Sequence, residues 1–293
     1  MGKPEGEPEP LTGGITNRNY RVTLGGGTYV IRLPGKDTSL LGIDRTAERE
    51  ANENAAAIGV APRVVAQLSD PPCLVTEFVE CSEMTPEVLR EREAMERVME
   101  TLRRVHDSGA ELPIAFDSFR VVERYRETAA SRGADIPEAF DEAHERAGQI
   151  EAALSGAEHD PVPCHNDLLA GNFLQGSERI WIVDWEYAGM GDRYFDLANF
   201  AINNELRPEQ HPDLLADYFS EEATPRRIAT LRLMLFMSDF REAMWGVVQT
   251  VASDLDVDFD DYAAKHFARM RETAANEDFD AWLRDAGDDG TPG

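Results

Sequence analysis

The chain has 293 residues, of which 42% are hydrophobic, a length and composition that fit one large globular domain or two lobes that share a cleft. Asp and Glu number 56 against 29 Lys and Arg, which gives a net charge of −27. Such a negative surface repels nucleic acid and anionic lipid, so neither is expected as a partner. The acidic residues are spread along the chain, which indicates a halophilic, solubilising surface for a salty cytoplasm; an acidic patch that recruits a cationic substrate is compatible with it.

The cysteines indicate a reducing compartment, and the hydrophobic pattern gives no sign of a membrane segment. Cys73, Cys81 and Cys164 form neither a paired framework nor a metal-ligand spacing. The opening segment MGKPEGEPEP is acidic and has no apolar stretch, and no apolar run approaches the ~18 residues of a membrane helix. We therefore expect a cytoplasmic protein without a membrane partner, while the sequence leaves the oligomeric state open.

The first part of the chain is predicted to be rich in strands. Residues 1–10 have the composition of a disordered tail. Gly25, Gly26 and Gly27 separate two strand-like runs, which is the signal of a hairpin. The predicted elements are strands at 19–23 and 28–33, a helix at 46–58 that Gly59 ends, and an apolar strand at 73–79.

The rest of the chain is predicted to be mainly helical. Apolar residues repeat at helical spacing from Met95 to Val105, and a long apolar helix is expected at 226–251. Between them, a Pro-flanked loop leads to a short strand at 180–183. We therefore expect an α+β fold with two lobes, a small β-rich lobe at 1–80 and a larger, mainly helical lobe at 81–293, whose polar loops meet in a cleft.

Two loops of the larger lobe carry the residue types that phosphoryl transfer to an alcohol needs. A carboxylate must accept the hydroxyl proton, and Asp167 suits this role. Asn172 and Asp184 supply the amide and carboxylate oxygens that Mg²⁺ prefers. The spacing H-x-D-x-x-x-x-N, followed by an Asp after an apolar strand, matches the catalytic and metal loops of protein kinases. The alternative is a polar turn before a buried strand. His165 is interpreted as a brace of the loop.

The small lobe contains a candidate phosphate-binding segment. The run TGGITNRN combines glycines with short hydroxyl and amide side chains, which lets backbone N–H groups approach phosphate oxygens. Thr16, Asn17 and Asn19 are therefore candidate cofactor-binding residues. Taken alone, a Gly-Gly turn is a weak signal.

An arginine in an apolar strand is the second candidate in this lobe. Arg32 needs a partner if it is buried, and ATP phosphates with a carboxylate of the next helix would supply one. Glu48 is the chosen carboxylate and Glu50 the reserve; the alternative is a solvated ion pair at a sheet edge. If the lobes clamp ATP, the backbone of Glu77 and Val79 would contact the adenine edge.

The sequence resembles the choline/ethanolamine kinase family of the aminoglycoside-phosphotransferase-like superfamily, which has a protein-kinase-like fold. The resemblance rests on the following motifs: TGGITNRNYRV, YVIRLPG, RTAERE, GVAP, VTEFV, CHNDLLAGNFL, IVDWEYAGMGDRYFDLANFAINNE, REAMWGVVQ and DFDDY. It implies ATP and Mg²⁺ as cosubstrates, Asp167 as the base, Asn172 and Asp184 as metal ligands, and an ion pair between Arg32 and Glu48. It also implies that Asp196 braces the catalytic loop.

The resemblance further implies a substrate pocket for the ammonium head of an amino alcohol, made of aromatic rings and carboxylates. Matching rings are Tyr187, Trp245 and Tyr262, and we assign Glu186 and Glu242 to the same pocket. Trp245 lies on an apolar helical stretch, where a plain core position is the alternative. Glu242 stands where some family members carry a second Trp, which puts the choice between choline and ethanolamine in doubt.

Three hypotheses for the function follow. The first is a choline/ethanolamine kinase. The second is a kinase of the same fold for another hydroxylated small molecule, such as an aminoglycoside, thiamine or a sugar. The third is a non-catalytic nucleotide-binding protein, which the intact Asp167, Asn172 and Asp184 disfavour.

Overall fold

The N-terminal hairpin forms where the glycines between two strand-like runs predict it. Strands β2 (Arg18–Leu24) and β3 (Gly27–Leu33) pair antiparallel along their full length. Gly25 and Gly26 between them have φ values of 58° and 80°, a left-handed conformation that only glycine adopts without steric cost. The predicted hairpin is therefore confirmed.

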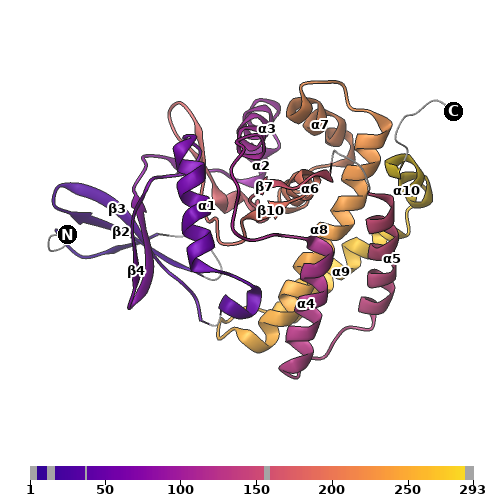
Figure 1. Ribbon diagram of the computed structural model, residues 1–293, viewed down its shortest axis with the longest axis horizontal. Helices are drawn as coiled ribbons and strands as arrows, with labels where there is room; N and C mark the ends of the chain where they lie inside the picture. Colours follow the sequence, from indigo (N-terminus) through magenta and orange to yellow (C-terminus); the bar gives the residue numbers. More distant parts are fainter. Residues whose placement is uncertain (1–4, 12–16, 37, 155–158, 288–293) are drawn as a thin grey trace.

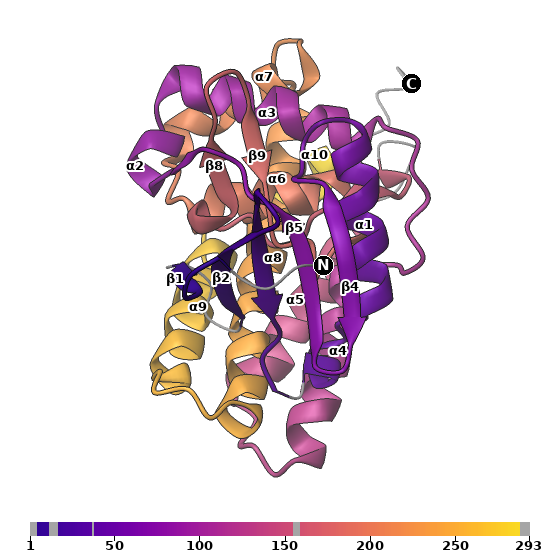
Figure 2. The same ribbon diagram turned by 90° about the vertical axis from the view of Figure 1, so that its left-hand side faces the viewer.

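The hairpin is part of a five-stranded antiparallel sheet in the order β1-β2-β3-β5-β4. The computed structural model describes residues 5–11, 17–36, 38–154 and 159–287. The further elements of the small lobe are β1 (Glu9–Leu11), η1 (Thr38–Leu41), α1 (Arg45–Ala57), β4 (Val64–Ser69) and β5 (Pro72–Glu77). Figure 1 shows this sheet on one side of the molecule and the helices of the larger lobe on the other. Figure 2 shows the strands in front, with α8 and α5 behind them.

The prediction of a disordered tail over residues 1–10 is wrong at its C-terminal end. Glu9 and Pro10 belong to β1, which pairs antiparallel with β2. An edge strand tolerates proline because one side of its backbone makes no ladder bonds. The Glu9 carboxylate also lies 3.7 Å from the Arg21 guanidinium of β2.

The larger lobe is mainly helical, as predicted. Its helices are α2 (Pro86–Leu89), α3 (Arg92–His106), α4 (Ser118–Ser131), α5 (Ala139–Ala153), η3 (Ala170–Asn172), α6 (Arg193–Asn203), η4 (Pro208–Gln210), α7 (His211–Phe219), α8 (Pro225–Ala252), α9 (Phe259–Ala274) and α10 (Phe279–Gly287). The long helix α8 lies at the centre and packs against α4, α6, α9 and α10 (Figure 1). Most of its residues from Ala229 to Gln249 are buried, which explains why its sequence is mainly apolar.

Short strands position the polar loops of this lobe. They are β6 (Ser82–Glu83), β7 (Val162–Cys164), β8 (Phe173–Gln175), β9 (Ile180–Ile182) and β10 (Gly189–Gly191). Strand β7 pairs with β10, and β8 pairs with both β6 and β9. The chain leaves the five-stranded sheet after Glu77 and enters the sheet of the larger lobe at Ser82. Within the described ranges, no helix has the length and apolar character needed to cross a bilayer.

The net charge of −27 gives a prediction about salt. Because counterions screen repulsion between surface carboxylates, the thermal midpoint and the activity should both rise as KCl increases toward molar concentration. Differential scanning fluorimetry from low to molar KCl measures the midpoint. A midpoint that is flat or falls over this range would contradict the interpretation of the acidic surface.

Candidate active site

A buried aspartate holds the loop that follows β7 through hydrogen bonds to its backbone. Asp196 on α6 accepts hydrogen bonds from the backbone N–H groups of His165, at 2.8 Å, and Asn166, at 2.6 Å. Asn166 has a φ of 66°, and Asp184 in the neighbouring loop has a φ of 68°. Non-glycine residues hold this left-handed conformation only where their surroundings enforce it. The hydrogen bonds that Asp196 accepts therefore fix the backbone that precedes Asp167.

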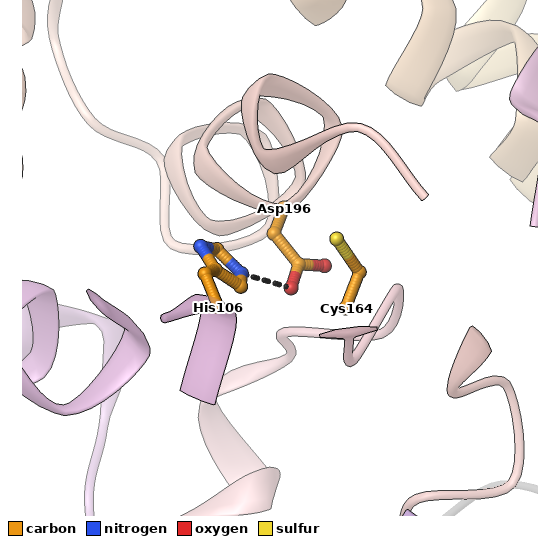
Figure 3. Close-up of side chains that lie close together, drawn as sticks. All are labelled: His106, Cys164 and Asp196. Carbon is orange, nitrogen blue, oxygen red and sulfur yellow. Dashed lines mark hydrogen bonds and ion pairs between the residues drawn. The ribbon is translucent and has the colours of Figure 1, made fainter. Parts of the chain in front are cut away.

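The same aspartate belongs to a fully buried cluster with His106 and Cys164 (Figure 3). His106 contacts Asp196 through Nε2, at 3.0 Å, and the Tyr218 hydroxyl through Nδ1, at 2.6 Å. Burial, together with the nearby Asp196, raises the pKa of the Cys164 thiol well above its usual value. The three groups have the proximity of metal ligands, but both nitrogens of His106 and both oxygens of Asp196 already make hydrogen bonds. The cluster therefore supports the loop through these hydrogen bonds.

His165 links the two loops of the site, as the sequence interpretation expects. The Asp167 N–H donates to its Nδ1 at 3.2 Å, so Nε2 carries the proton and donates to the Val183 carbonyl at 3.0 Å. Burial lowers the pKa of His165, which agrees with a neutral ring. The ring also packs edge-on against Trp185, with centroids 4.7 Å apart.

Asp167, Asn172 and Asp184 come together at one end of the cleft. Asn172 Nδ2 donates to the Asp167 carbonyl at 2.8 Å, and the Asn172 carbonyl accepts from the Val183 N–H at 3.0 Å. Among the described residues, none donates to Asn172 Oδ1. This amide oxygen and the Asp184 carboxylate are hard donors that fit a divalent cation such as Mg²⁺.

The expected contact between Arg32 and Glu48 is present, with Arg32 Nη1 2.9 Å from Glu48 Oε1. Glu48 on α1 is buried against the sheet, whereas Glu50 is partly exposed and lies 3.8 Å from Arg49. Arg32 also forms an ion pair with Asp184, which the sequence analysis did not predict. The arginine therefore connects α1 of the small lobe to the second loop of the larger lobe.

Arg45 is a site residue that sequence reasoning missed. Its Nη1 donates to Glu48 Oε2 at 2.7 Å and to Glu186 Oε2 at 3.0 Å, so it bridges the two lobes. Asn17, a predicted phosphate-loop residue, donates to the same oxygen of Glu186 at 3.0 Å. Burial and the nearby Asp184 raise the pKa of Glu186 to about 7, against the effect of Arg32 and Arg45. The available signal was Arg45 lying three residues before Glu48, one helical turn apart.

A cavity of about 240 Å³ lies between the lobes. The predicted cofactor-binding residues Asn19, Arg32, Glu77 and Val79 line it, together with Asn172 and Asp184. Its remaining walls are mainly apolar and include Val30, Leu74 and Leu174. Thr16 lies outside the described residues. The cavity has the polar end and apolar walls that a nucleotide needs.

A second cavity of about 170 Å³ adjoins the first and shares Gly171, Asn172 and Asp184 with it. All five predicted substrate-binding residues line this acceptor cavity, beside Asp167; they are Glu186, Tyr187, Glu242, Trp245 and Tyr262. Trp245 Nε1 donates to the Tyr187 hydroxyl at 2.9 Å, and the Tyr262 hydroxyl donates to Glu242 at 2.8 Å. Trp245 is thus buried in the lobe and lines the cavity at the same time.

Arg241 also lines the acceptor cavity, and sequence reasoning did not identify it. It forms an ion pair with Glu242, and its Nη1 lies 3.8 Å from Asp167 Oδ1. Burial raises the pKa of the Asp167 carboxyl well above its usual value; Glu242, Asp184 and Glu186 add to the rise, and Arg241 opposes it. Burial also tends to raise the pKa of Glu242, but Arg241 holds it below its usual value. Arg241 therefore offsets the negative charge of Asp167 and Glu242.

This geometry agrees with comparisons to known proteins. The model of the phosphotransferase enzyme family matches residues 7–231. Protein LicA of Haemophilus influenzae is 29% identical over 269 residues, which cover 88% of this chain and 77% of that protein. Human ethanolamine kinase 2 is 28% identical over 302 residues, which cover 90% of this chain and 76% of that enzyme. The chain belongs to the phosphotransferase enzyme family and is a kinase.

Comparison with solved structures assigns the chain to a narrower family within the phosphotransferases. A crystal structure of a choline/ethanolamine kinase family protein from Mesorhizobium loti has a TM-score of 0.84 and 30% identity, and the match covers 97% of this chain and 93% of that one. Within the phosphotransferases, the chain is thus a member of the choline/ethanolamine kinase family. The predicted two-lobed, protein-kinase-like fold is confirmed.

Proposed function

We propose that this kinase transfers the γ-phosphoryl group of ATP to the hydroxyl of a small amino alcohol, choline or ethanolamine, in a reaction that depends on Mg²⁺. The observation that carries the proposal is the acceptor cavity, where Asp167 lies among three aromatic rings and several carboxylates. Ring faces and carboxylates attract an ammonium group, and such a group would leave the hydroxyl near Asp167. The relatives named above support a substrate of this class.

The residues of this chain have separate roles in the proposed reaction. Asp167 accepts the proton of the acceptor hydroxyl, while the hydroxyl oxygen forms a bond to the γ-phosphorus and the bond between the γ-phosphorus and the ADP oxygen breaks. Asn172 and Asp184 hold the divalent cation, which neutralises charge on the phosphate oxygens when it is bound. Arg32, positioned by Glu48, anchors the phosphates, and the hinge residues Glu77 and Val79 contact the adenine.

We propose that this reaction takes place in the cytoplasm, because the cysteines of the chain are free thiols. Cys73, Cys81 and Cys164 are all unpaired thiols, and two of them are buried. Free thiols and the use of ATP support the cytoplasm.

A screen of acceptors tests the proposal. ADP release is measured at molar KCl with choline, ethanolamine, thiamine, aminoglycosides and sugars. We expect release that depends on Mg²⁺ or Mn²⁺ and is strongest with an amino alcohol. Strongest release with an aminoglycoside, thiamine or a sugar would refute the proposed acceptor class but leave the kinase assignment intact.

The ring of Trp245 gives a prediction about substrate affinity. Trp245→Ala removes a cation–π partner, worth roughly 0.5–2 kcal/mol, from the acceptor cavity. We expect the KM for choline or ethanolamine to rise at least ~10-fold, about 1.4 kcal/mol, while the KM for ATP stays within about twofold. Steady-state kinetics with each substrate varied in turn measures both. An equal rise in KM for the amino alcohol and for ATP would show that Trp245 has a purely structural role.

A further inference from the structure

Arg241 places a positive charge in a cavity that would otherwise suit a bare ammonium. Its side chain is 1% exposed and lines the acceptor cavity beside Asp167. The guanidinium lies over the Tyr187 ring, 4.5 Å from the ring centroid, so it occupies an aromatic face that a substrate ammonium would otherwise use. A cation at this position repels one end of any positively charged acceptor.

One edge of the Arg241 guanidinium has no hydrogen-bond acceptor within the described part of the chain. Nη1 donates to Glu242, whereas neither Nε nor Nη2 has a hydrogen-bond partner among the described residues, although both atoms are buried. Buried N–H groups without an acceptor are destabilising, so native proteins rarely leave them unpaired. The N–H groups of Nε and Nη2 lie parallel along one edge of the planar guanidinium, a geometry that matches the two oxygens of a carboxylate.

The same cavity is also lined by carboxylates and rings that attract an ammonium. Glu186 and Glu242 line it with Trp245 and Tyr262, and the Glu242 carboxylate keeps its pKa below the usual value despite burial. Positive and negative side chains thus lie beside each other around Asp167, the proposed proton acceptor, whose Oδ1 is 3.8 Å from Arg241 Nη1. A ligand with both charges close to its hydroxyl fits this arrangement better than a single cation does.

We infer that the preferred acceptor is a small hydroxy amino acid, in which Arg241 binds the carboxylate and Glu186, Glu242 and the rings bind the ammonium. This inference rests on the proposed phosphoryl transfer to a small amino alcohol, and it replaces choline or ethanolamine as the preferred acceptor by an amino alcohol that also carries a carboxylate. The reaction is unchanged: the hydroxyl oxygen bonds to the γ-phosphorus of ATP, ADP leaves, and Asp167 accepts the proton. Arg241 is then the residue that determines specificity between hydroxy amino acids and amino alcohols without a carboxylate.

Two acceptors that differ by one carboxylate test the inference on the unmodified protein. L-Serine is ethanolamine with a carboxylate on the carbon that bears the amine, and L-homoserine extends the distance to the hydroxyl by one methylene. We expect kcat/KM for one of these hydroxy amino acids to exceed that for both ethanolamine and choline by at least ~10-fold. Higher kcat/KM for ethanolamine or choline would overturn the inference and leave the proposed function standing. No phosphorylation of any of the four would overturn both.

Substitution of Arg241 tests the residue itself. In Arg241→Gln, the ratio of kcat/KM for the hydroxy amino acid to that for ethanolamine should fall at least ~10-fold, because the bidentate partner is lost. The ratio is measured within one variant, so a general loss of folded enzyme cancels. Arg241→Gln with Glu242→Gln avoids an unpaired buried carboxylate and should show the same fall. Arg232→Met, on the same helix but outside the cavity, should keep the wild-type ratio. An unchanged ratio in the Arg241 variants would overturn the assignment.

Discussion

Asp167→Asn should lower kcat by ~10²–10⁴, the usual contribution of a positioned general base. The amide keeps the shape of the side chain but cannot accept the hydroxyl proton. The fold should not suffer, because burial and the neighbouring carboxylates raise the pKa of Asp167 and make its ionised form costly at neutral pH. We therefore expect a thermal midpoint equal to or above that of the wild type.

Kinetics, calorimetry and thermal unfolding together separate this prediction from a structural effect. The affinity for ATP should stay within about twofold, since Asp167 does not line the nucleotide cavity. Full activity in Asp167→Asn would remove this residue from the role of base. A large drop in the thermal midpoint would show instead that Asp167 is needed for the loop.

Asp196→Asn should destabilise the protein by about 3 kcal/mol, because two charge-assisted hydrogen bonds to backbone N–H groups are lost or weakened. In either orientation of the amide, its NH₂ group faces an N–H group that donates to an oxygen of Asp196 in the wild type. The backbone of His165 and Asn166 would then lose the support that holds the loop in its left-handed conformation. Chemical denaturation measures the loss in the free energy of unfolding, and kcat should fall with it.

A matched control exists on α10. Asp285→Asn removes one negative charge, as Asp196→Asn does, but Asp285 is exposed. Its effect on the free energy of unfolding should stay within about 0.5 kcal/mol. If both variants lose the same stability, general electrostatics rather than the buried brace would explain the result.

The sequence was most informative where chemistry demands particular residues at fixed spacing. Asp167, Asn172 and Asp184 were predicted from the requirements of phosphoryl transfer; all three line the acceptor cavity, and Asn172 and Asp184 also line the nucleotide cavity. Helical phase explains why Glu48 and not Glu50 contacts Arg32. Residues two positions apart point to different faces of a helix, and only one of them can meet the sheet.

Charged residues within buried segments were harder to interpret. Arg241 and Glu242 are adjacent in the middle of an apolar helix, where neighbours in sequence point in directions about 100° apart and contact is not expected from spacing. The overlooked signal is the cost of burial: two opposite charges in an apolar run require partners. Arg45 was missed because its contact with Glu186 joins positions 141 residues apart, and no local pattern reveals such a pair.

The most direct test of the proposed phosphoryl transfer is phosphorus NMR of the reaction products at molar KCl. Wild-type protein is incubated with ATP, Mg²⁺ and the acceptor that gives the highest rate of ADP release, and Asp167→Asn is run beside it. We expect a phosphomonoester signal to grow in step with ADP for the wild type and to be nearly absent for the variant. Formation of ADP with inorganic phosphate alone, at the same rate with and without the acceptor, would contradict the proposed transfer to an amino alcohol.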